Sequence, residues 1–173
     1  MKIKGVFLLI ILFLSTGCST IRALVGGEYN NMRNYETEDE MMNAAIQDAQ
    51  DSLPVFIEAL QDPQPGQSNF SIKAKFPYGN EGAAEHIWVN DVSYKDGRFN
   101  GNIGNTPIYI DDLAYGDAVS ISTEEVSDWM IVQDDRLLGG FTIYVMLGEM
   151  TDENRQDYYN EFGFWFAEKP VTE

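Results

Sequence analysis

Apolar residues between positions 41 and 53 recur three or four residues apart, the spacing that places side chains on one face of an α-helix. Thr37, with a glutamate three residues later, forms a capping-box pattern at the start of this amphipathic helix. Pro54 should end or kink the helix just before it, because proline lacks a backbone donor and clashes with the preceding turn. One or two further turns are expected over residues 55–60, up to the Pro- and Gly-containing segment 62–66.

After this segment the apolar residues fall at every second position, which is typical of half-buried β-strands. The first such strand is expected over residues 70–76. Residues 86–94 and 98–103, joined by Lys95-Asp96-Gly97, have the pattern of a β-hairpin. Further short strands, separated by turn residues, are expected over residues 108–110, 118–122, 129–132 and 141–147.

A last helix is expected from Asp152 to about Glu161, with Thr151 as its N-cap. The aromatic residues at 162–166 should pack back onto the domain. The predicted fold is α+β, with an N-terminal helix packed on a curved antiparallel sheet and a short C-terminal helix. An SH3-like partial barrel is one sheet arrangement that fits. We expect a single domain over residues 37–173, since no repeat or second linker interrupts it.

The first seventeen residues have the pattern of a secretory signal peptide. Lys2 and Lys4 precede nine consecutive apolar residues, which are too few to span a bilayer. The run ends in Leu-Ser-Thr-Gly followed by Cys18, which resembles the lipobox of bacterial lipoproteins, where the cysteine is acylated and becomes the new N-terminus. The alternative is an ordinary signal peptide with an incidental cysteine.

Acylation of Cys18 predicts a lipid-anchored protein of the bacterial cell envelope. Two or three acyl chains hold a protein stably on a membrane, whereas a single chain does not. Residues 18–36 are then a flexible tether. Ser19, rather than an aspartate after the cysteine, indicates the outer membrane facing the periplasm in a host with two membranes.

Charge and composition exclude several classes of protein. The chain has 11 Lys and Arg against 28 Asp and Glu, and removing residues 1–17 changes its net charge from −17 to −19. Such a surface argues against nucleic-acid binding, which needs cations to displace counterions. One histidine and one cysteine leave no Cys-rich or multi-His metal site. No cofactor is expected, because the nucleotide-binding fingerprints are missing, and the acidic pairs are interpreted as solvated turns rather than calcium ligands.

A series of short motifs occurs in order between residues 44 and 147. They are Leu53-Pro54-x-Phe56, Lys73 with Phe76, Glu85-His86-Ile87-Trp88-Val89, Phe99-x-Gly101, Asn105-x-Pro107, Gly116-Asp117-x-Val119, Val126-Ser127-Asp128-Trp129-Met130 and Gly139-Gly140-Phe141-Thr142. In this order they resemble the uncharacterised bacterial YegJ-like family, a domain of unknown function. The resemblance implies an α+β domain of bacterial origin and supplies no established activity.

The only histidine lies in the most chemically suggestive stretch, Glu85-His86-x-Trp88. On a strand, His86 and Trp88 share a face and Glu85 points to the other. One hypothesis is that His86 and Trp88 join Asp128 and Trp129 in lining a binding pocket. The favoured interpretation is structural, with both tryptophans in the core, a neighbour hydrogen-bonded to His86, and Asp128 accepting backbone hydrogen bonds.

Two functional hypotheses follow, and no residue is assigned a catalytic role. The leading one is a non-enzymatic binding module whose acidic surface suits a basic protein or an envelope component, as in an immunity or inhibitor protein. The alternative is an envelope hydrolase that uses His86 with Glu85 or Asp128. The hydrolase requires His86 and a carboxylate to converge in an open pocket.

Overall fold

The computed structural model describes residues 40–79, 82–148 and 150–173. The predicted signal peptide, Cys18, the tether and the Thr37 cap lie outside the described residues. The helices that flank the sheet are α2 (Glu40–Asp51), α3 (Leu53–Gln61), α4 (Phe141–Leu147) and α5 (Asp152–Phe162), with the 3₁₀ turn η1 at Thr123–Glu125. In the described part of the chain, no helix is both long and apolar enough to cross a membrane.

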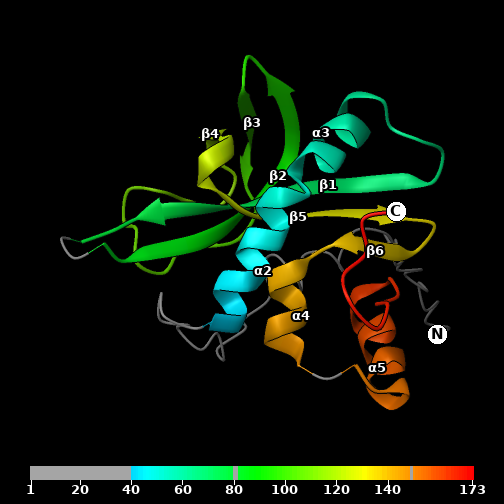
Figure 1. The fold of residues 1–173 in the computed structure, drawn as a ribbon. Helices are drawn as coiled ribbons and strands as arrows, with labels where there is room; N and C mark the ends of the chain where they lie inside the picture. The colour runs from blue at the N-terminus through cyan, green and yellow to red at the C-terminus, as the bar shows by residue number, and fades with distance from the viewer. Residues whose placement is uncertain (1–39, 80–81, 149) are drawn as a thin grey trace, which may run out of the picture.

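Six antiparallel strands form one open sheet in the order β4-β3-β2-β1-β5-β6 (Figure 1). The α+β fold is therefore confirmed, and the sheet does not close into a barrel. The strands are β1 (Gln67–Pro77), β2 (Ala84–Lys95), β3 (Arg98–Ile103), β4 (Ala118–Ser122), β5 (Val126–Gln133) and β6 (Arg136–Gly139).

Side chains on the two faces of the sheet build two hydrophobic clusters. On one face, α2 and α3 cover the larger cluster, in which Phe56, Phe99 and Trp129 are fully buried. On the other face, Trp88 and Met130 pack with aromatic residues of α4, α5 and the C-terminal segment. This pattern follows from the alternation of side chains along a strand, because neighbouring residues point to opposite faces. The central strands β1, β2 and β5 are therefore covered on both sides.

Several predictions of local structure are confirmed. The first helix ends at Asp51, one turn residue separates it from α3, and Pro54 lies in the first turn of α3. The hairpin of β2 and β3, strand β4 and helix α5 also lie where the sequence places them. Three of the C-terminal aromatic residues are buried, whereas Trp165 remains 38% exposed.

Two predicted strands are wrong. Residues 141–147 form helix α4, which begins after Gly140 in the left-handed conformation (φ 69°), and its first four residues are all buried. A helix buried all round has no polar face, so its sequence has the same apolar character as a buried strand. Residues 108–110 lie in a loop, because the backbone N–H groups of Ile108 and Tyr109 donate to a side chain rather than to a strand.

Strand β6 was not predicted. It is four residues long and ends at Gly139, for which the sequence indicates only a turn. Gly139 has a φ of 71°, and a Cβ at this position would overlap the backbone carbonyl of Trp129. The strand therefore approaches β5 closely at a residue that only glycine can supply.

Candidate functional site

Three neighbouring strands bring a lysine, a tryptophan and an aspartate to one face of the sheet. Lys73 on β1 is opposite Trp88 on β2 and opposite Asp128 on β5. The Lys73 ammonium lies 5.5 Å from the centroid of the Trp88 ring, within the range of a cation–π interaction. Its Nζ also donates to Thr142 Oγ1 of α4 at 3.2 Å. We call these four residues the Lys–Asp cluster. All four are buried.

Asp128 holds the N-terminus of α4. Its carboxylate accepts from the backbone N–H groups of Phe141 (3.1 Å) and Thr142 (2.8 Å) and from the Thr142 hydroxyl (2.6 Å). A fourth donor is the backbone N–H of Trp129 at 2.8 Å. The first N–H groups of a helix lack partners within the helix, and a carboxylate there also interacts favourably with the helix dipole. Asp128 therefore acts as a cap supplied from another strand.

Burial acts on both charged members of the Lys–Asp cluster. It raises the pKa of Asp128, against the opposing effects of the Thr142 hydroxyl and the Lys73 charge. It lowers the pKa of Lys73, against the attraction of Asp128. Each charge thus compensates part of the other's desolvation. The cluster is an interior polar network that joins the sheet to α4, with its polar atoms turned inward.

A β-bulge connects His86 to this network. Lys73 pairs with Asp128 and Ala74 pairs with Val126, which leaves Ser127 as an extra residue on β5. The Ser127 hydroxyl lies 2.8 Å from His86 Nδ1 and donates to the Lys73 carbonyl at 3.2 Å. With its proton on that carbonyl, the hydroxyl accepts the Nδ1–H of a neutral imidazole.

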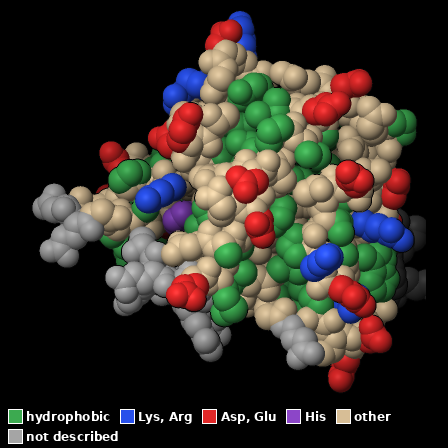
Figure 2. All heavy atoms as spheres, viewed as in Figure 1, with side chains coloured by type: hydrophobic (Ala, Val, Ile, Leu, Met, Phe, Trp, Pro, Cys, Tyr) green, Lys and Arg blue, Asp and Glu red, His purple; other side chains and the backbone are tan. Residues whose placement is uncertain are grey.

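His86 is half-buried, and Figure 2 shows the histidine at the surface beside a basic side chain. Burial, together with the positive charges of Lys73 and Lys75, lowers the pKa of His86 from 6.5 to about 4. The imidazole is therefore neutral at pH 7. A general base benefits from a pKa near the working pH, so this environment does not tune His86 for proton transfer.

The domain should become less stable as the pH is lowered, and part of this loss depends on His86. The unfolded chain protonates this imidazole near pH 6.5 and the folded domain only near pH 4, so the unfolded state binds more protons between these values. Folding is then disfavoured as the pH drops. Between pH 7 and pH 5 we expect His86 to remove roughly 2 kcal/mol from the free energy of unfolding.

Urea denaturation of the wild type and of His86→Gln at both pH values measures this contribution. Carboxylates titrate in both proteins, so the difference between the two pH dependences isolates the imidazole. The same loss of stability on acidification in both proteins would contradict the prediction.

Glu85 binds the backbone of a loop and not His86, with which the hydrolase hypothesis paired it. It is 9% exposed, and its two carboxylate oxygens accept from the backbone N–H groups of Ile108 (2.8 Å) and Tyr109 (3.0 Å). The side chain of Asn105 accepts from the backbone N–H of Trp88 at 2.8 Å. These bonds hold the loop of residues 104–117 against β2.

Trp129 lies on the opposite face of the sheet from the Lys–Asp cluster. Its indole Nε1 donates to the Ala49 carbonyl and to Ser52 Oγ, both at 3.1 Å, where α2 meets α3. Of the four residues considered for one pocket, the structure brings Trp88 and Asp128 together and places His86 beside them through Ser127. Trp129 is separated from them by the sheet.

The sequence pattern does not predict the partners that complete the network, Lys73, Ser127 and Thr142. All three stand within the motifs of the family resemblance. A lysine at a polar position of a half-buried strand is expected to face solvent. Lys73 is buried instead, because β1 is covered on both faces. The bulge at Ser127 and the helix that carries Thr142 have no local signal in the sequence.

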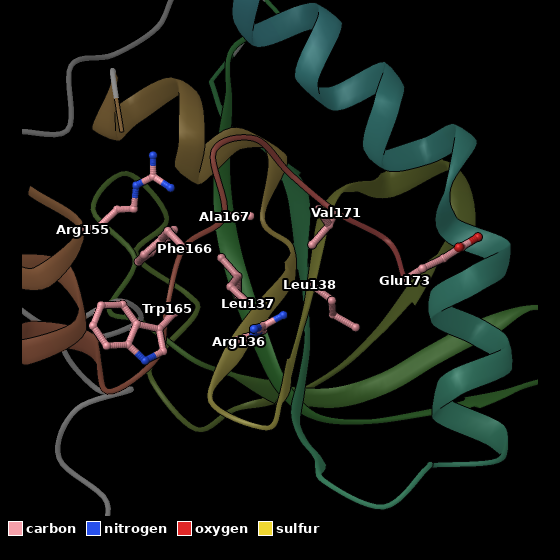
Figure 3. A pocket seen from close by; sticks show the side chains of 9 residues that line it. All are labelled: Arg136, Leu137, Leu138, Arg155, Trp165, Phe166, Ala167, Val171 and Glu173. Carbon is pink, nitrogen blue, oxygen red and sulfur yellow. The ribbon is translucent and has the colours of Figure 1, made fainter. Parts of the chain in front are cut away.

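A groove of about 520 Å³ lies between β6 and the C-terminal segment (Figure 3). The segment covers the outer edge of β6, because the Leu137 N–H donates to the Trp165 carbonyl and the Gly139 N–H donates to the Val171 carbonyl. Arg155, on the wall of the groove, donates to the Met150 carbonyl and lies 3.9 Å from two acidic side chains. The candidate site residues Glu85, His86, Trp88, Asp128 and Trp129 do not line this groove, whereas Trp165 and Phe166 of the C-terminal aromatic residues do.

Within the part of the chain that the structure describes, no three His, Cys, Asp or Glu side chains are placed to hold a metal ion together. The carboxylates of Glu85 and Asp128 are already occupied by N–H and hydroxyl donors.

Comparison with known families places this α+β domain among bacterial proteins. Residues 39–166 match the family described as "Uncharacterized protein conserved in bacteria (DUF2314)", and the chain belongs to it. The match extends beyond the motifs at 44–147 and includes α5 and the C-terminal aromatic residues. The resemblance inferred from those motifs is confirmed.

Two relatives give the family its immediate context. The chain is 34% identical over 146 residues to the uncharacterized protein YegJ of Escherichia coli (strain K12), covering 83% of this chain and 88% of that protein. It is 35% identical over 95 residues to a putative ankyrin repeat protein of Neisseria meningitidis serogroup B (strain ATCC BAA-335 / MC58), covering 54% of this chain and 37% of that protein. No solved structure matches the chain.

Proposed function

We propose that this chain is a non-enzymatic binding module with an acidic surface, held on the bacterial cell envelope by a lipid at Cys18. The observation that carries the proposal is that the candidate reactive side chains are all hydrogen-bonded within the fold. Asp128 caps α4, Glu85 holds the loop at 104–117, and His86 is bonded to Ser127. Each of these side chains has a structural hydrogen-bond partner, so none of them is available to react with a substrate.

The hydrolase alternative has less support from the same geometry. It needs a carboxylate that orients His86, as in catalytic triads. In the described structure the hydrogen-bond partner of His86 is Ser127, and neither Glu85 nor Asp128 bonds to the imidazole. Ser127 itself is 2% exposed and donates to the Lys73 carbonyl, which leaves it poorly placed as a nucleophile.

The anchor and the charge are compatible with one another in this proposal. Acidic side chains are spread over the face of the domain seen in Figure 2, and they repel anionic headgroups. The acyl chains, rather than the domain, then hold the protein at the membrane. In a host with two membranes, the serine after Cys18 supports the outer membrane facing the periplasm. The acidic domain is suited to a basic protein or an envelope component, as an immunity or inhibitor protein would be.

The anchor is tested by mass spectrometry of the membrane fraction and by the variant Cys18→Ser. We expect the wild type to begin at residue 18 with two or three acyl chains, and the variant to leave the membrane fraction, because a hydroxyl cannot replace the thiol as acyl acceptor. An unmodified cysteine, or cleavage elsewhere, would contradict the anchor.

The binding role is tested separately, by capture from envelope extracts at low and moderate salt. The wild type, His86→Gln and Ser127→Ala should recover the same partner in equal yield. Two results would contradict a non-enzymatic role: no reproducible partner, or a partner that is covalently altered by the wild type alone.

A further inference from the structure

The loop of residues 104–117, between β3 and β4, exposes a concentration of apolar surface. Six large apolar side chains are exposed in the described part of the chain, and three of them belong to this loop. Ile108 is 61% exposed, Tyr115 50% and Tyr109 45%. Tyr78, at the end of β1, stacks on Tyr109 with ring centroids 4.9 Å apart. We call Tyr78, Ile108 and Tyr109 the apolar patch.

The loop is ordered by specific bonds at both ends. The Gly116 N–H donates to the Ile103 carbonyl at 2.9 Å, and the Ile103 N–H donates to the Asp117 carbonyl at 2.9 Å, which makes this a closed Ω-loop. The buried carboxylate of Glu85 holds its tip by two further bonds.

Ile110 and Leu113 pack this loop onto the larger hydrophobic cluster, and the Glu85 carboxylate fixes its solvent-facing tip in addition. Burying a carboxylate is unfavourable unless it is well bonded, and its bonds here fix two residues whose side chains face solvent. A preordered loop that presents tyrosines is well suited to a protein interface. Aromatic side chains dominate binding energy, and a rigid loop loses little entropy on association.

The charged residues beside the apolar patch are acidic. Asp111 and Asp112 follow its tip directly and are exposed, and residues 104–117 include no Lys or Arg. Neither aspartate takes part in an ion pair between described residues. Carboxylates at the rim of an interface favour a partner of opposite charge and accelerate its association.

We propose that the apolar patch and its two aspartates are the docking surface for a basic partner protein. The partner packs apolar side chains against Ile108 and the tyrosines and places lysines or arginines against Asp111 and Asp112. The inference rests on the proposed binding function and assigns that function to one loop and one chemistry of partner.

Photo-crosslinking in living cells of the bacterium that makes the protein tests this surface. A photoreactive phenylalanine replaces Ile108 in the full chain, and the same residue at Trp165, beside β6 at the other edge of the sheet, is the matched control. We expect one discrete adduct with a basic protein from position 108 and none from position 165. The pair Asp111→Asn and Asp112→Asn should reduce the adduct by about fivefold. The pair Asp134→Asn and Asp135→Asn, which removes equal charge elsewhere, should leave it unchanged.

The other outcomes separate this inference from the proposed function. An adduct from position 165 alone would overturn the loop as docking surface and leave the binding module standing. An adduct from position 108 with a lipid or an acidic protein, or one indifferent to Asp111→Asn and Asp112→Asn, would overturn the basic partner. No adduct from either position, together with no captured partner, would overturn both proposals.

Discussion

Replacing Asp128 with alanine is expected to lower the free energy of unfolding by about 3–5 kcal/mol, the cost of breaking a buried charge pair by removing one partner. The substitution leaves the first N–H groups of α4 and the Thr142 hydroxyl without their acceptor. It also leaves the buried Lys73 ammonium without the carboxylate that offsets its desolvation. Both effects act in the interior, where water cannot replace the lost partners.

Urea denaturation of five proteins measures this effect and separates its parts. They are the wild type, Asp128→Ala, Asp128→Asn, Lys73→Met and the double variant Asp128→Asn/Lys73→Met. Asp128→Asn keeps an acceptor but removes the charge, so Lys73 becomes an unpaired buried cation. The double variant should therefore be more stable than the sum of the two single losses indicates. A loss below about 1 kcal/mol for Asp128→Ala, or strict additivity in the cycle, would contradict this account of the cluster.

Local signals were enough to predict the elements whose determinants are local. Pro54 separates α2 from α3, and Lys95-Asp96-Gly97 forms the turn of the β2–β3 hairpin. Helix α5 begins at the residue after Thr151, whose hydroxyl accepts from the Asn154 N–H as an N-cap. In each case the responsible residues lie within the element or beside it.

Where a distant residue determines the structure, the sequence pattern was misleading. Residues 141–147 are apolar enough for a strand, and the acceptor that begins a helix there is Asp128, thirteen positions earlier on β5. Residues 108–110 have the character of a short strand, and their backbone donors are taken by Glu85. Such contacts depend on the tertiary arrangement, which single-sequence periodicity does not contain.

In the candidate site, too, local features could be predicted from the sequence and contacts between distant residues could not. Alternation along β2 correctly placed His86 and Trp88 on one face. Applied to Asp128 and Trp129, the same alternation separates two neighbours that the pocket hypothesis had joined. Which strand faces which depends on the sheet order, so the meeting of Lys73 with Asp128 could not be read from the sequence.

Trp129 provides the second large expected effect, on the other face of the sheet. Its ring is fully buried against Phe56 and Phe141, with centroids 5.6 and 5.8 Å away, and its Nε1 binds the junction of α2 and α3. Trp129→Ala removes both the ring and the donor, and we expect a loss of about 3–5 kcal/mol in the free energy of unfolding.

A graded series distinguishes packing from hydrogen bonding at this position. Trp129→Phe keeps most of the apolar ring but leaves the Ala49 carbonyl without its indole donor, so we expect a loss of about 1–3 kcal/mol. Trp165→Phe, at a residue that is 38% exposed, is the control and should cost less than about 1 kcal/mol. The three values come from urea denaturation followed by circular dichroism. If Trp129→Phe were as destabilising as Trp129→Ala, the indole donor rather than the packed ring would be what joins the helices to the sheet.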